Sequence, residues 1–167
     1  MNQKLTVDFS YPTCLGSCHF KDFHNCLCDE QTLAKKLTHV IGKMIPEISS
    51  KTILELKNNR LYHTHPIVGE KSELVFGIIK EILKQRYDWD TRTIDRWIDN
   101  QCLMMMPIWQ ISCPDSKGIR LIGFVKDSVF NVLFIDYYHT IYPDEKNNEE
   151  NIESYNFSAI TYLKESR

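Results

Sequence analysis

The stretch that decides the fold runs from Gly118 to Tyr142 and reads GIRLIGFVKDSVFNVLFIDYYHTIY. Its apolar and β-branched residues predict two long strands that are joined by a tight turn at Lys126–Ser128. The first strand carries a single charge, Arg120. The second ends in a polar and aromatic cluster made of Asp136, Tyr137, Tyr138, His139 and Tyr142. We therefore expect a buried hairpin with titratable side chains at one end.

Helical patterns precede this hairpin along the chain. Asp29 is expected to cap a helix whose apolar stripe continues until Pro46 ends it. A short second helix follows Ser49 or Ser50. The segment Glu70–Gln85 has the clearest helical period, because its apolar residues recur as adjacent pairs every four positions. A further helix is predicted from Asp90 or Thr91 through Asn100.

These patterns predict an α+β fold, in which an antiparallel sheet built mainly from residues 103–142 is covered on one face by helices from the N-terminal two-thirds. Residues 60–67 are compatible with an edge strand, because Pro66 cannot donate a hydrogen bond. Residues 1–58 are expected to be a cysteine-rich and helical extension, packed as one compact unit with an α+β domain at 59–167. The residues expected in the core are Leu37, Ile41, Leu74, Ile78, Ile82, Trp97, Leu121, Phe124, Leu133 and Ile135.

The sequence also predicts the structure of three smaller segments. Met104–Met106 is most simply core filler, because methionine adapts to irregular gaps, with a partner surface as the alternative. The acidic segment Pro143–Ser154 is expected to be a solvated loop or to be partly disordered. Phe157–Leu163 is expected to return to the sheet as a short strand.

Composition excludes some classes of function. The chain has 167 residues, of which 43% are hydrophobic, and a formal net charge of −2. It therefore has no global basic field to drive non-specific binding to nucleic acid by counterion release. The N-terminus lacks the apolar stretch of a secretory signal, and no apolar run approaches the ~20 residues of a transmembrane helix. We expect a cytoplasmic protein with no membrane partner and with reduced cysteines.

Four of the six cysteines lie close together near the N-terminus. Their spacing is Cys14-x3-Cys18-x7-Cys26-x-Cys28, with His19 and His24 between them. Short-spaced Cys and His residues are the ligands of tetrahedral zinc, so the four cysteines are a candidate zinc site that could order this segment. The alternative is that they are small buried apolar side chains.

A second candidate is His63-Thr64-His65-Pro66. In a strand, His63 and His65 would face the same way and could share one metal. The four residues resemble the core motif of JAMM-type zinc metalloproteases. That family also requires a downstream Ser-x-x-Asp, whereas Ser72 is followed here by Glu73, Leu74 and Val75. The alternative is a pair of histidines on a polar strand or loop.

Arg120, Asp136 and His139 are the titratable residues of the hairpin. Strand alternation places Asp136 with Tyr138 on one face and His139 with Tyr137 on the other. Arg120 could hold a phosphate, and His139 could transfer a proton near neutral pH. The alternative is an Arg–Asp pair that ties two strands together. The tyrosines could likewise stack on bases or only pack across strands.

The order of elements from residue 60 to 142 is strand, two helices and three antiparallel strands, which resembles the RelE/ParE-type toxin fold. Arg120-Leu121-Ile122 and the strand that ends near His139 carry the resemblance. It implies a small metal-independent ribonuclease of toxin–antitoxin systems that cuts mRNA, often on the ribosome. Arg120 would bind the phosphate, His139 would act as acid or base, and Tyr142 would assist.

A non-enzymatic function is also open. The chain could be a cytosolic protein-interaction module of a mobile element or phage, stabilised by zinc at its N-terminus. The two functions differ in one residue-level expectation, because only the ribonuclease depends on Arg120 and His139.

Overall fold

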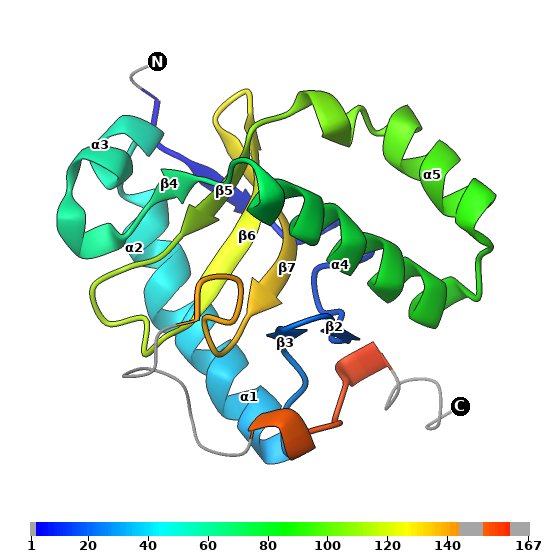
Figure 1. Cartoon of the computed structure of the whole chain (residues 1–167). Helices are drawn as coiled ribbons and strands as arrows, with labels where there is room; N and C mark the ends of the chain where they lie inside the picture. Colours follow the sequence, from blue (N-terminus) through cyan, green and yellow to red (C-terminus); the bar gives the residue numbers. More distant parts are fainter. Residues whose placement is uncertain (1–2, 144–151, 161–167) are drawn as a thin grey trace.

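The computed structural model describes residues 3–143 and 152–160, and a five-stranded mixed sheet lies at its centre (Figure 1). The strand order is β1-β7-β6-β5-β4. A separate two-stranded sheet pairs β2 with β3. The strands are β1 (Thr6–Asp8), β2 (His19–Phe20), β3 (Phe23–His24), β4 (His65–Pro66), β5 (Ile108–Ile111), β6 (Arg120–Lys126) and β7 (Val129–Asp136).

The predicted hairpin is confirmed as the centre of the sheet. β6 and β7 pair in antiparallel fashion from Arg120 opposite Asp136 to Lys126 opposite Val129. The two residues of the turn between them, Asp127 and Ser128, both have positive φ, as a type I′ hairpin turn requires. A bulge interrupts the ladder beside Gly123, where the register shifts.

The sheet is not antiparallel throughout, which corrects the predicted topology. β1 lies parallel to β7 at one edge, with Thr6 opposite Val129. The sequence did not reveal this strand, because three residues are too few to show an alternating pattern. β4 forms the opposite edge, as predicted, but it is only two residues long, and Arg60–Tyr62 forms a 3₁₀ turn instead of a strand.

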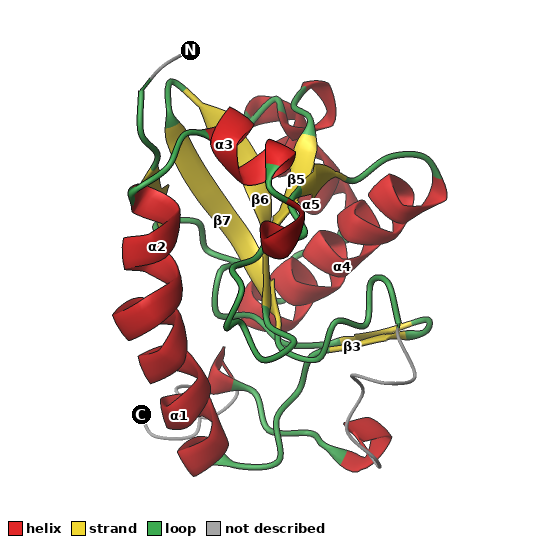
Figure 2. Ribbon diagram, turned by 90° about the vertical axis from the view of Figure 1, so that its left-hand side faces the viewer, coloured by secondary structure: helices red, strands yellow, loops and turns green. Residues whose placement is uncertain are grey.

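Helices cover both faces of the sheet, as Figure 2 shows, whereas the sequence predicted helices on one face only. One face carries α1 (Glu30–His39), α2 (Ile45–Ser49) and α3 (Ile53–Asn58), and the other carries α4 (Glu70–Tyr87) and α5 (Thr91–Asn100). The physical reason lies in the central strands. Neighbours in β6 point to opposite sides, and both sides are apolar: Leu121 joins the first core and Ile122 the second. A sheet that is apolar on both faces needs two covering layers.

The helix that begins after Asp29 does not end at Pro46. The Asp29 carboxylate caps it by accepting from the Thr32 N–H at 2.7 Å, as predicted. A π-helical turn, Val40–Met44, then connects α1 to α2. This wider turn accommodates the proline ring, which would clash with the preceding carbonyl in a regular α-helix. It also leaves Ile41 62% exposed, so its placement in the core was wrong.

Most other core residues are placed as expected. Ile78, Ile82, Leu121, Phe124, Leu133 and Ile135 are buried. The side chains of Leu37, Leu74 and Trp97 lie half-buried at the edges of the two cores. Met104 and Met105 are 63% and 83% exposed, which excludes the core-filler interpretation for these two residues.

The described residues include only part of the two segments predicted at the C-terminus, the strand at 157–163 and the loop at 143–154. Phe157 forms a single antiparallel bridge with Leu27, so the predicted strand at Phe157–Leu163 is reduced to one bridge among residues 157–160. Residues 161–163, and most of the predicted loop at 143–154, lie outside the described ranges. All six cysteines lie within them, and each is a free thiol. Among the described helices, none has the length and apolar character needed to cross a membrane.

Candidate functional site

Arg120 and His139 line one pocket of about 350 Å³, although they come from different elements. The pocket lies where the loop between β5 and β6 meets the segment that follows β7. His63 reaches it from the turn before β4. The residues that line it are His63, Cys113, Pro114, Ser116, Lys117, Gly118, Arg120 and His139. The structure therefore brings together the two residues on which the predicted phosphate site depends.

Arg120 is fixed in position by the end of β6. Its side chain is only 7% exposed, and its Nη1 donates to the Ser116 hydroxyl at 2.9 Å and to the Ile119 carbonyl at 3.0 Å. Its buried Nε–H has no hydrogen-bond partner among the described residues. Burial lowers the pKa of Arg120, and the nearby Asp136 opposes this shift. The guanidinium remains charged, because even a lowered arginine pKa lies far above neutral.

Asp136 explains how His139 comes to the same pocket. Its buried carboxylate accepts the backbone N–H groups of Tyr138, Thr140 and Ile141 at 2.9–3.3 Å. Burial raises the pKa of Asp136, while these hydrogen bonds oppose the shift. The chain wraps around the carboxylate, so β7 ends at Asp136. The predicted alternation of faces through Tyr142 was therefore wrong, because residues after Asp136 are not in a strand.

Three of the polar residues that line the pocket have left-handed backbones. The φ angles are 43° at His63, 51° at Lys117 and 60° at His139. Such conformations cost non-glycine residues about 1–3 kcal/mol each and persist only where the surrounding structure enforces them. Backbone strain of this kind gathers at functional sites. At these three positions the surrounding fold therefore holds the backbone in a defined conformation.

The charge of the lining is positive. Arg120 and Lys117 are cations, His63 and His139 are imidazoles, and the described lining contains no carboxylate. The nearby Asp115 is exposed and forms an ion pair with Lys43 at 3.0 Å. The pocket is therefore suited to an anion. Sequence reasoning missed His63 and Lys117 as members of this site, because their meeting with Arg120 depends on tertiary structure.

Tyr142 does not join Arg120 and His139. Its ring packs edge-on against His65, with centroids 5.2 Å apart, and the Lys71 ammonium lies 5.7 Å from its centre. Tyr142 is absent from the described lining of the pocket. Tyr137 and Tyr138 are buried, which fits packing in the core and not stacking on bases.

The side chains of His63 and His65 lie in different surroundings. The strand begins only at His65, so the two side chains do not follow strand alternation. The His65 Nε2 lies 3.2 Å from the Gln110 amide nitrogen, next to Tyr142, whereas His63 lines the Arg120 pocket. The metal pair expected from the JAMM-like motif is not assembled.

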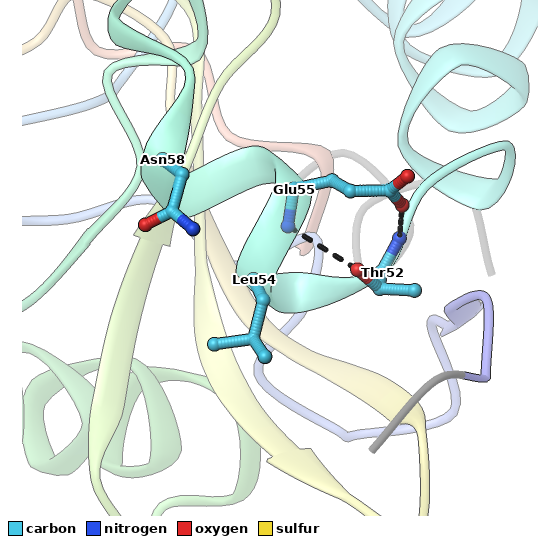
Figure 3. A pocket seen from close by; sticks show the side chains of 4 residues that line it. All are labelled: Thr52, Leu54, Glu55 and Asn58. Atoms are coloured by element: carbon cyan, nitrogen blue, oxygen red, sulfur yellow. Dashed lines mark hydrogen bonds between the residues drawn. The ribbon is translucent and has the colours of Figure 1, made fainter.

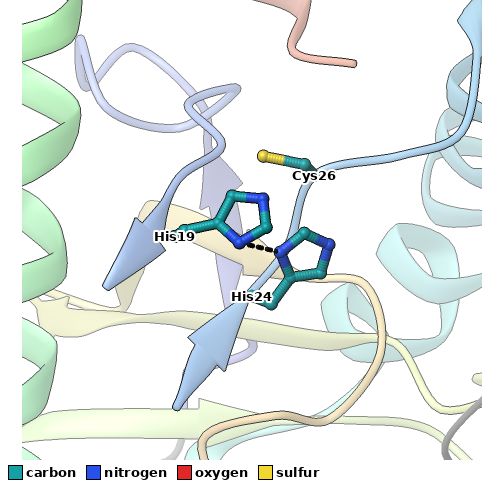
Figure 4. Close-up of side chains that lie close together, drawn as sticks. All are labelled: His19, His24 and Cys26. Carbon is teal, nitrogen blue, oxygen red and sulfur yellow. Dashed lines mark hydrogen bonds between the residues drawn. The ribbon is translucent and has the colours of Figure 1, made fainter. Parts of the chain in front are cut away.

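The N-terminal cysteines do not form the predicted set of four ligands. The Cys14 thiol bonds to the Phe9 carbonyl at 3.0 Å, and Cys28 lies 2.9 Å from the Thr32 hydroxyl. Cys18 is buried in the core beside α4. Instead, ligand atoms of His19, His24 and Cys26 lie within 4.8 Å of one another (Figure 4). The part of the chain that the structure describes thus contains a mixed His–His–Cys cluster.

Burial is the main cause of the pKa shifts of His24 and Cys26. It lowers the pKa of His24 to about 4, with a smaller contribution from His19, and the backbone of Ile152 opposes the shift. It also raises the pKa of the Cys26 thiol to about 11. Both groups are therefore neutral at pH 7 when no cation is present.

A second hollow, of about 520 Å³, lies beside α3 and is shown in Figure 3. Its lining contains the capping box of this helix. The Thr52 hydroxyl accepts from the Glu55 N–H at 3.2 Å, and the Glu55 carboxylate accepts from the Thr52 N–H at 2.7 Å. Thr52 and Glu55 are therefore already paired with the helix N-terminus.

Comparisons with known proteins identify a family but no relative of known activity. Neither the curated proteins nor the solved structures gave a match. A family model matches residues 10–165, which include the whole described pocket and the His–His–Cys cluster. The chain belongs to the family described as Uncharacterised protein UU032.

Proposed function

We propose that the chain is a metal-independent ribonuclease of the toxin type, acting on mRNA and in the manner of ribosome-dependent toxins. The observation that supports this proposal is that Arg120, Lys117, His63 and His139 line one pocket, in which no described residue contributes a carboxylate. Cleavage of RNA without a metal needs a base, an acid and a cation, and this lining supplies candidates for all three.

The reaction is an internal transfer of the phosphate. The ribose 2′-oxygen attacks the adjacent phosphorus, a new O2′–P bond forms and the P–O5′ bond breaks. One side chain takes the proton of the 2′-hydroxyl, and another gives a proton to the departing 5′-oxygen. The products are a 2′,3′-cyclic phosphate and a free 5′-hydroxyl, so no water, oxidant or cofactor is consumed.

Each side chain has a role that its environment supports. Arg120 would stabilise the charge on the phosphorane, because it lines the pocket and the Ser116 hydroxyl holds its guanidinium in place. His63 and His139 would be the base and acid pair, and Lys117 at the rim would attract the RNA backbone. Tyr142 has no role in this scheme, because it lies outside the pocket lining.

The test is expression of the full chain followed by incubation of the purified protein with ribosomes and mRNA. Wild-type protein is expected to arrest growth and to leave 2′,3′-cyclic phosphate ends. His63→Ala, His139→Ala and Arg120→Lys are each expected to reduce the cleavage rate at least about 100-fold. His65→Ala is the matched histidine control and should cleave at the wild-type rate. Harmless expression together with intact mRNA would end the proposal.

One observation favours a second function. The exposed Met104 and Met105 offer an adaptable apolar surface of the kind that binds other proteins. The chain would then be a non-enzymatic interaction module of a mobile element or phage, with zinc holding its N-terminal hairpin. This function predicts capture of a host protein that Met104→Ser with Met105→Ser abolishes and that Arg120→Lys leaves unchanged.

A further inference from the structure

The β2–β3 hairpin places three metal-ligating side chains on one surface. His19 and His24 are directly opposite each other across the two strands, and the tight turn between them contains Lys21 in a left-handed conformation. Cys26 follows His24 by two residues, so in extended chain its side chain returns to the same side. The three ligand atoms lie within 4.8 Å of one another (Figure 4).

The hydrogen bonds of His19 direct its lone pair toward this cluster. Its Nε2 lies 3.1 Å from the carbonyl oxygen of Tyr155. A carbonyl oxygen only accepts, so Nε2 carries the proton and Nδ1 is left as the basic nitrogen. That Nδ1 lies 2.7 Å from Nδ1 of His24, which must therefore donate to it. A backbone acceptor on the far nitrogen is the usual partner of a histidine that binds a metal.

We propose that His19, His24 and Cys26 bind one Zn²⁺ ion, through Nδ1 of the two imidazoles and the Cys26 thiolate. Nitrogen and sulfur donors in this combination suit zinc, and three protein ligands leave a fourth position for water. The Zn²⁺ replaces the hydrogen bond between the two rings. Two nitrogens on one tetrahedral zinc lie about 3.3 Å apart, so the rings separate by about 0.6 Å. The exposed position of His19 allows this movement.

Binding is balanced by loss of a proton. His24 changes tautomer, so that its proton moves from Nδ1 to Nε2, and the Cys26 thiol releases its proton to solvent. The positive ion provides the charge that makes a buried thiolate favourable. The proton released for each Zn²⁺ bound is that of the Cys26 thiol.

The location of the cluster indicates what the metal does. His19 contacts the backbone of Tyr155, and Leu27 pairs with Phe157, so the hairpin and residues 152–160 meet at this site. A bound ion fixes the ring of His19, and with it the hydrogen bond from His19 Nε2 to the Tyr155 carbonyl of the C-terminal segment. The inference is independent of the ribonuclease proposal, because the cluster shares no residue with the Arg120 pocket.

The experiment measures zinc in the full chain, purified without chelator and without a histidine tag. About one equivalent per chain is expected in the wild type, and less than about 0.2 in His19→Ala and Cys26→Ser. Cobalt added to metal-free protein should give a thiolate-to-cobalt charge-transfer band that Cys26→Ser loses. Zinc should also raise the melting temperature of the wild type by several degrees and leave that of Cys26→Ser unchanged.

Cys28→Ser is the matched control, because Cys28 is a neighbouring cysteine outside the cluster. It is expected to keep the wild-type stoichiometry and the cobalt band. Circular dichroism of metal-free His19→Ala, in which only an exposed side chain is lost, shows whether the fold survives. Less than about half an equivalent in the wild type, or full binding by Cys26→Ser, would overturn the proposal.

Discussion

Asp136 ends β7 and organises the loop that brings His139 to the candidate site. A carboxylate without exposed surface is costly unless its oxygens are hydrogen-bonded. Here the oxygens accept from three backbone N–H groups. The bonds fold residues 137–141 into a compact loop and set the position of His139 in the pocket that Arg120 also lines. One buried acid thus positions the loop that carries His139 without touching a substrate.

Asp136→Ala is expected to destabilise the protein by about 3–5 kcal/mol, because it leaves three backbone donors without an acceptor and Arg120 without its neighbouring negative charge. Asp136→Asn keeps one acceptor oxygen and should cost less. Urea unfolding followed by circular dichroism measures both values. Asp115→Ala removes an exposed carboxylate as the control and is expected to change stability by less than about 1 kcal/mol. Equal stability of the two alanine variants would contradict the role given to Asp136.

At the scale of elements, the β6–β7 hairpin depends on close contact at its bulge. A side chain at Gly123 would collide with the backbone carbonyl of Asn131 on β7 and approach the Phe130 ring within 3.0 Å. Backbone atoms of a paired strand cannot move aside cheaply. Gly123 therefore permits the register shift that orients the two halves of the hairpin.

Gly123→Ala is expected to lower the free energy of unfolding by about 1–3 kcal/mol, because the added methyl group overpacks the strand pair. Gly42→Ala is the matched control. Gly42 sits in the π-helical turn, and apart from the backbone of its own helix no described atom lies within 4 Å of a methyl group there. Alanine at this position should therefore be neutral or stabilise by up to about 1 kcal/mol. Thermal melting of the two variants distinguishes them. A Gly123→Ala protein as stable as the wild type would show that the strands are not in close contact there.

Elements with a long, regular pattern could be predicted from the sequence. The hairpin, α4 and the Asp29 cap are in place because each is decided by local periodicity or by one side chain. The elements that were not predicted depend on contacts between residues far apart in the sequence or on backbone geometry that leaves no sequence pattern. The π turn before Pro46 and the parallel strand Thr6–Asp8 have no local signal. In the candidate site, Arg120 and His139 were identified by residue type, whereas His63 and Lys117 could be added only once the loops were placed.

At the scale of the whole molecule, the N-terminal segment contacts β7 and the loop that follows it. β1 pairs with β7, the Asn25 side chain donates to the Ile135 carbonyl at 2.8 Å, and Thr140 donates to the His24 carbonyl at 2.9 Å. The N-terminal segment therefore supports the same loop that carries His139. It also supplies α1 and α2, which cover one face of the sheet (Figure 2).

A fragment of residues 59–167 is accordingly expected not to fold on its own. Without the first 58 residues, one face of the sheet exposes apolar side chains of β6 and β7, among them Leu121, Phe130 and Val132. At about 25 cal/mol per Å² of apolar surface, exposing even a few hundred Å² removes most of the stability of a small domain. Near-ultraviolet circular dichroism and urea unfolding of the fragment should show no cooperative transition. Adding residues 1–58 as a separate chain should restore one, because the missing layer is supplied again. A fragment that unfolds cooperatively by itself would mean that the N-terminal segment is an independent extension and not a layer of the fold.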